Sequence, residues 1–106
     1  MTTEPLRLTP DLVTAYIAWC RAQAVAAKRE VNERWLRAKE LHLDWWMFAL
    51  TDRDLTKLRL ADLLSQLEGA SDRAKRIVVI KHLYTFLRLT DRVEAGQDPT
   101  RVGQNA

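Results

Sequence analysis

The 106-residue chain is short of the residues from which disulfide frameworks, metal centres and membrane spans are built. A single cysteine, Cys20, excludes an internal disulfide, and His42 and His82 add too few ligands for a zinc cluster. Three glycines and three prolines argue against a turn-rich sandwich or barrel. No apolar run approaches the roughly 20 residues of a membrane span, and no signal-peptide pattern opens the chain. We therefore expect a cytoplasmic protein with no metal, no cofactor and no membrane association.

The residues that are present favour helices. Apolar residues make up 47% of the chain and recur at helical spacing, without strand alternation or an internal repeat. Thr9-Pro10-Asp11 is a typical helix start, Ser71-Asp72 is a second one, and Gly69 stands where a helix would end. The pattern predicts four helices, over residues 10–28, 32–50, 55–67 and 72–89. We expect a compact all-α bundle of four to five helices.

The four predicted helices indicate a single domain. Residues 10–92 form the expected helical domain, residues 1–9 an N-terminal extension, and residues 93–106, which contain turn formers and no periodicity, a C-terminal tail or linker. A chain of this length can bury one core but not two.

The large aromatic residues are interpreted as core residues. Trp35, Trp45 and Trp46 could be ligand-stacking groups, but they lie in a predicted helix that is apolar on nearly all sides and therefore central. Tyr16 and Tyr84 fall on apolar helix faces, which favours packing over a nucleophilic role. The sequence shows no acid–base pair, phosphate-binding loop, nucleophile elbow or HExxH motif. It therefore predicts no catalytic residues.

Positive charge gathers in one segment. The chain has a net charge of +3, and residues 71–92 alone contain six basic and two acidic residues. The polar side of the fourth predicted helix contains no carboxylate; it carries Lys75, Lys81, His82, Thr85 and Arg88. Solvent-facing helices usually mix signs, because opposite charges one turn apart stabilise them. Phosphate oxygens would supply the negative charge that this helix face lacks. Lys57 and Arg59 form a second group of basic residues at the start of the third predicted helix.

Four segments between Asn32 and Pro99 also follow one another in a characteristic order. They are LHLDWWMFAL, DLTKLRLADLLSQLEG, SDRAKRIVVIKHLYTFLR and GQDPT, within about two thirds of the chain. Together they resemble the core-binding domain of tyrosine recombinases, the SAM-like helical domain of phage integrases. Three positions depart from the family pattern: threonine is common where this chain has Arg59 and Ala74, and asparagine where it has Asp98.

The resemblance implies a function in DNA integration or recombination. Core-binding domains clamp double-stranded DNA with helices laid against the major groove, while a separate C-terminal domain carries the catalytic arginine–histidine–arginine set and tyrosine. On this hypothesis the chain is non-catalytic by itself, and the catalytic domain would follow it. Phosphate contacts would come from Lys57, Arg59, Lys75, Lys81 and Arg88, and groove contacts from His82 and Thr85. Two matters stay open: oligomerisation on DNA with the full-length recombinase, and the role of the helix at 10–28.

The alternative from a different class is a helical protein–protein interaction module. Its basic face would dock an acidic partner or a second copy of the chain, and an exposed Trp19 or Trp46 would favour this interpretation. A small-molecule enzyme has no support in the sequence.

Overall fold

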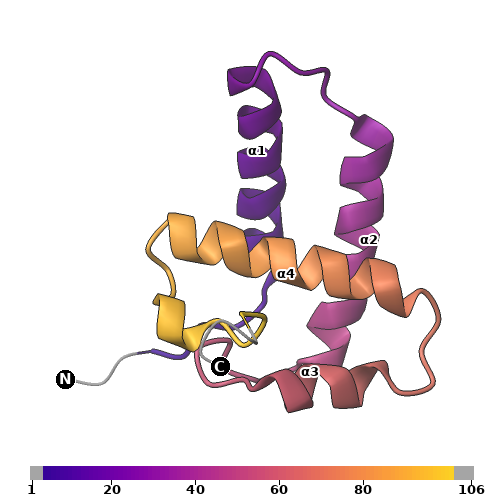
Figure 1. Ribbon diagram of the computed structural model, residues 1–106, viewed down its shortest axis with the longest axis vertical. Coiled ribbons are helices and arrows are strands. Elements are labelled where there is room, and N and C mark those ends of the chain that lie inside the picture. Colours follow the sequence, from indigo (N-terminus) through magenta and orange to yellow (C-terminus); the bar gives the residue numbers. More distant parts are fainter. Residues whose placement is uncertain (1–3, 102–106) are drawn as a thin grey trace.

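The computed structural model describes residues 4–101, which form four α-helices and one short 3-10 helix and contain no β-strand. The elements are α1 (Pro10–Ala26), α2 (Glu33–Ala49), α3 (Leu60–Leu67), α4 (Arg73–Leu89) and η1 (Ala95–Gln97). Helices α1 and α2 stand side by side and run in opposite directions, α4 crosses both, and α3 lies beneath the lower end of α2 (Figure 1). The predicted all-α bundle is confirmed. None of these helices is long and apolar enough to cross a bilayer.

Side-chain caps explain where α1 and α2 begin. The Thr9 hydroxyl oxygen accepts a hydrogen bond from the Leu12 amide at 3.2 Å, and Pro10 occupies the first turn of α1. The side-chain oxygen of Asn32 accepts from the Trp35 amide at 3.0 Å in the same way at the start of α2. These positions were predicted to start helices, and the structure confirms them.

A residue with a positive φ follows each of the four α-helices: Lys28 after α1, Asp52 after α2, Gly69 after α3 and Asp91 after α4. Lys28 has a φ of 57° just after α1, at the predicted boundary between the helices over residues 10–28 and 32–50. Gly69 has a φ of 75° just after α3, a conformation that glycine adopts without strain. Asp72 occupies the N-cap position of α4, so the helix start predicted at Ser71-Asp72 is in the right place. Its φ is 54° and its side chain makes no capping hydrogen bond, so the expected capping interaction is not formed.

The third helix is shorter than predicted. It begins at Leu60 instead of Leu55, because the Asp54 carboxylate turns the preceding chain. That carboxylate accepts hydrogen bonds from the amide and hydroxyl of Thr56, at 3.0 and 2.8 Å, and from the Leu6 amide at 3.3 Å. Leu55 and Leu58 are nevertheless buried, as the apolar pattern indicated.

The segments on either side of the helical domain pack onto it. The Leu55 amide donates to the Leu6 carbonyl at 2.7 Å, and Leu8 is buried in the core. Val93 and Asp98 are buried at the other end of the described chain. Residues of the predicted N-terminal extension and C-terminal tail therefore pack against the helical domain.

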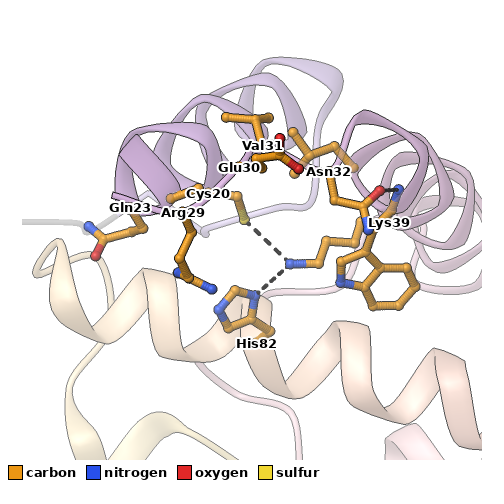
Figure 2. A pocket seen from close by; sticks show the side chains of 11 residues that line it. Cys20, Gln23, Arg29, Glu30, Val31, Asn32, Lys39 and His82 are labelled. Atoms are coloured by element: carbon orange, nitrogen blue, oxygen red, sulfur yellow. Dashed lines mark hydrogen bonds between the residues drawn. The ribbon is translucent and has the colours of Figure 1, made fainter. Parts of the chain in front are cut away.

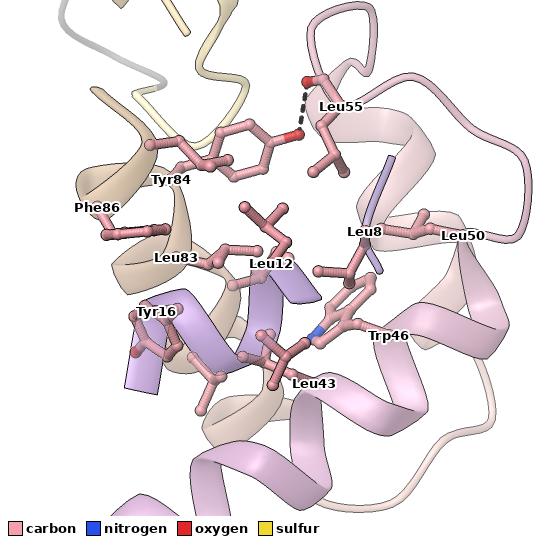
Figure 3. Close-up of a cluster of buried hydrophobic side chains, with 14 of the residues drawn as sticks. Leu8, Leu12, Tyr16, Leu43, Trp46, Leu50, Leu55, Leu83, Tyr84 and Phe86 are labelled. Carbon is pink, nitrogen blue, oxygen red and sulfur yellow. Dashed lines mark hydrogen bonds between the residues drawn. The ribbon is translucent and has the colours of Figure 1, made fainter. Parts of the chain in front are cut away.

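Large aromatic side chains fill the core where the helices meet (Figure 3). Trp46, Tyr16 and Tyr84 are fully buried, as predicted. The Trp46 indole N–H donates to the Arg76 carbonyl at 3.0 Å, and the Tyr84 hydroxyl donates to the Leu55 carbonyl at 2.8 Å, so the polar ends of both rings are satisfied. Trp35 and Trp45, which were predicted to be core residues, are only half-buried.

Two leucines of α2 test this packing directly. Leu43 is fully buried, so Leu43→Ala should lower the free energy of unfolding by about 3 kcal/mol through lost burial and a new cavity. Leu41, two residues away, is 55% exposed, and Leu41→Ala should change it by less than about 0.5 kcal/mol. Urea unfolding of both variants checks this. Equal losses at the two positions would contradict the orientation of α2.

Candidate nucleic-acid interface

The outward side of α4 carries the strongest part of the predicted basic face. Lys75 and Lys81 are both exposed, and neither forms an ion pair with any residue between 4 and 101. Thr85 lies half-buried one turn after Lys81 and donates its hydroxyl to the Lys81 carbonyl at 3.2 Å. Val78 lies between the two lysines and is 54% exposed. We call the surface formed by Lys75, Val78, Lys81 and Thr85 the α4 outer face.

The structure does not leave Arg88 free for a phosphate. Its Nε donates to Oδ2 of Asp98 at 2.8 Å, and the Asp98 side chain is only 1% exposed. Asp98 also accepts from the Thr100 amide at 2.9 Å, which holds the carboxylate in place. The predicted acid-free face is therefore corrected at its C-terminal end, because the chain after α4 folds back and brings a carboxylate to it.

His82, which was predicted to contact a DNA groove, points into the bundle. Its Nδ1 lies 2.7 Å from the Tyr16 hydroxyl and 3.2 Å from Nζ of Lys39. Because an ammonium can only donate, Nδ1 is the acceptor and the ring proton is on Nε2. Burial, and secondarily the charge of Lys39, lowers the pKa of His82 below its ordinary value. His82 is thus neutral near pH 7 and adds no charge to the α4 outer face.

Lys57 and Arg59 are exposed, but they lie apart from Lys75. Both precede α3, whereas the loop that leads into α4 leaves from the other end of that helix, eight residues away (Figure 1). Arg59 also lies 3.9 Å from the Asp62 carboxylate, which the Arg53 guanidinium approaches to 3.5 Å. These two residues therefore do not extend the basic surface at the start of α4.

Sequence reasoning missed a second polar site, between α1 and α2. A cleft of about 220 Å³ opens there; it is lined by residues that include Cys20, Arg29, Glu30, Trp35, Lys39 and His82 (Figure 2). Lys39 is only 8% exposed. It follows Leu36 by three residues and precedes Leu43 by four, so it stands on the buried stripe of α2. This placement on the buried stripe of α2 is the sequence feature from which the burial of Lys39 could have been predicted.

A wider, open hollow of about 450 Å³ adjoins this cleft. Trp35, Lys39 and His82 line both, and Lys81 and Thr85 line the open hollow only. The cleft and the open hollow beside the α4 outer face therefore meet at these three residues.

No protein-family model, curated protein or solved structure matches this chain. Its function is therefore inferred from the chemistry of its own surfaces.

The buried His82 predicts a pH dependence of stability. The pKa of His82 is lowered in the folded protein. As the pH falls, His82 therefore takes up a proton near pH 6.5 in the unfolded chain but only at a lower pH in the folded one. The free energy of unfolding should accordingly decrease as the pH falls below about 6.5. His82→Gln should flatten this dependence in urea titrations at a series of pH values.

His42 provides the matched control for this experiment. Its pKa is also lowered, mainly by burial and then by the charge of Arg76, but its ring lies outside the core. His42→Gln should flatten the dependence less than His82→Gln. The account of His82 fails if His42→Gln removes the pH dependence and His82→Gln leaves it intact.

Proposed function

We propose that the chain is a helical DNA-binding domain that contacts the phosphates of duplex DNA through the α4 outer face. One observation carries the proposal: the 17 residues of α4 include five basic residues and no acidic one, and Lys75 and Lys81 are exposed without an ion pair among the described residues. Lysines on such a face displace condensed counterions from DNA. The Thr85 hydroxyl already donates to the Lys81 carbonyl, so it offers no further donor to a phosphate oxygen. The resemblance to core-binding domains supports the narrower proposal of a non-catalytic domain of a tyrosine recombinase or phage integrase.

The proposed contact surface is smaller than the sequence suggested. Arg88 is neutralised by Asp98, and His82 is neutral and turned inward. Arg73, in the first turn of α4, joins Lys75 and Lys81 as the third exposed cation of this helix, whereas Arg76 is half-buried with its guanidinium 4.1 Å from the centre of the Trp45 ring. Three phosphate contacts give weak binding, which suits a domain that acts with a second DNA-binding unit.

A protein-interaction role is the second candidate, on a different surface. Phe48 is 86% exposed and Leu41 is 55% exposed, and these residues are two turns apart on one side of α2. The tryptophan anchors that would favour this role are absent, since Trp46 is fully buried and Trp19 is half-buried against Tyr16 and Phe86. A dimer in sedimentation that Phe48→Ser dissociates would favour this candidate.

Fluorescence anisotropy with a labelled duplex at several salt concentrations tests the DNA proposal. With about three phosphates neutralised, the plot of log K against log[salt] should have a slope of about −3. The double variant Lys75→Gln/Lys81→Gln should reduce the magnitude of that slope by about 2 and weaken binding at every salt concentration.

The double variant Arg7→Gln/Arg34→Gln is the charge-matched control. Both arginines are exposed and lie outside α4, so binding should change little apart from the loss of net charge. Binding that ignores salt, or that falls equally in the two double variants, would contradict the proposed contact surface.

A further inference from the structure

Lys39 is a buried cation without a counter-charge. Its side chain reaches between α1 and α4, where Nζ lies 3.2 Å from Nδ1 of His82 and 3.7 Å from Sγ of Cys20 (Figure 2). The rings of Tyr16 and Trp35 lie beside it, with their centres 5.6 and 5.5 Å from Nζ. No carboxylate between residues 4 and 101 forms an ion pair with it. Lysines are seldom buried unless they are paired, because an isolated charge is costly to remove from water.

The partners that Lys39 does have are weak or shared. The Tyr16 hydroxyl lies 2.7 Å from the same Nδ1 of His82, and this nitrogen offers a single lone pair. The thiol of Cys20 is a poor acceptor. An ammonium has three N–H donors, so Lys39 retains donor capacity that its protein neighbours do not satisfy.

A second cation faces the same space. Arg29, in the connection between α1 and α2, directs its guanidinium towards His82 (Figure 2), and it forms no ion pair with any described residue. Glu30 also lines the cleft, so its lining contains two cations and one acid. The volume of about 220 Å³ is smaller than the roughly 300 Å³ at the lower end of drug-sized sites. This space fits a phosphate group and is too small to enclose a whole nucleotide.

We propose that this cleft binds a small oxyanion, inorganic phosphate or the phosphate of a small monoester, between the Lys39 ammonium and the Arg29 guanidinium. A phosphate would supply the charge and the acceptors that Lys39 lacks, and the planar fork of Arg29 suits two of its oxygens. The site goes beyond the proposed DNA contact, because Lys75 and Lys81 do not line the cleft.

Isothermal titration calorimetry with inorganic phosphate tests the site, with sodium chloride at equal ionic strength as the reference titration. The wild-type chain should bind one phosphate saturably. Lys39→Met, which keeps the length of the side chain and removes its charge, should weaken binding by about tenfold or more. Arg29→Gln should weaken it by several-fold. Lys81→Gln is the control and should leave the phosphate affinity unchanged.

Absence of saturable binding, or equal affinity in the wild type and Lys39→Met, would overturn the proposal. If Lys39→Met does not fold, Arg29→Gln decides the matter, because Arg29 is exposed and its replacement leaves the core intact. The outcome is separable from that of the DNA experiment, since Lys39→Met should retain salt-dependent DNA binding and Lys75→Gln/Lys81→Gln should retain phosphate binding. Displacement of inorganic phosphate by a duplex with 5′-phosphates, but not by one without them, would identify a DNA end as the source of the oxyanion.

Discussion

The burial of one side of α4 is the constraint on which the rest of the structure depends. Val79, Ile80, Leu83, Tyr84, Phe86 and Leu87 are buried where this helix crosses α1 and α2. Each such side chain contributes about 1.5–3 kcal/mol on leaving water, so together they hold α4 in one rotation about its axis. That rotation directs Lys75 and Lys81 to solvent and turns His82 towards Lys39. Both proposed sites follow from the orientation of this single helix.

The parts of the fold that depend on local chemistry could be predicted from the sequence. The caps at Thr9 and Asn32 and the glycine at position 69 act within one helical turn, and their helix ends were predicted within about two residues. The late start of α3 depends in part on a local turn, in which the Asp54 carboxylate accepts from Thr56 two residues later, and this signal was missed. The hydrogen bond from the Leu6 amide to Asp54, 48 positions apart in the chain, could not be predicted. The packing of the terminal segments onto the core could not be predicted either, because these segments have no apolar periodicity.

The candidate sites, too, could be predicted only where they depend on residues close together in the sequence. A helical wheel is enough to predict that Lys75 and Lys81 share a solvent-facing surface. It cannot reveal that Asp98 neutralises Arg88, or that His82 is engaged by Tyr16 from 66 residues away. Lys39 differs from these, because its place on the buried stripe of α2 was readable from the sequence. Only the structure shows that Lys39 has no counter-charge among the described residues.

Cationic groups therefore lie on two sides of α4: the exposed Lys75 and Lys81, which we propose contact DNA, and the buried Lys39 of α2, which we propose binds a small oxyanion. A titration of the ¹⁵N-labelled chain with duplex DNA, followed by amide chemical shifts, tests the central claim about α4 most directly. The account predicts shifts concentrated on exposed residues of α4 between 73 and 85, with the amides around Leu41 and Phe48 unchanged. Shifts centred on α2, or spread evenly over the chain, would contradict it.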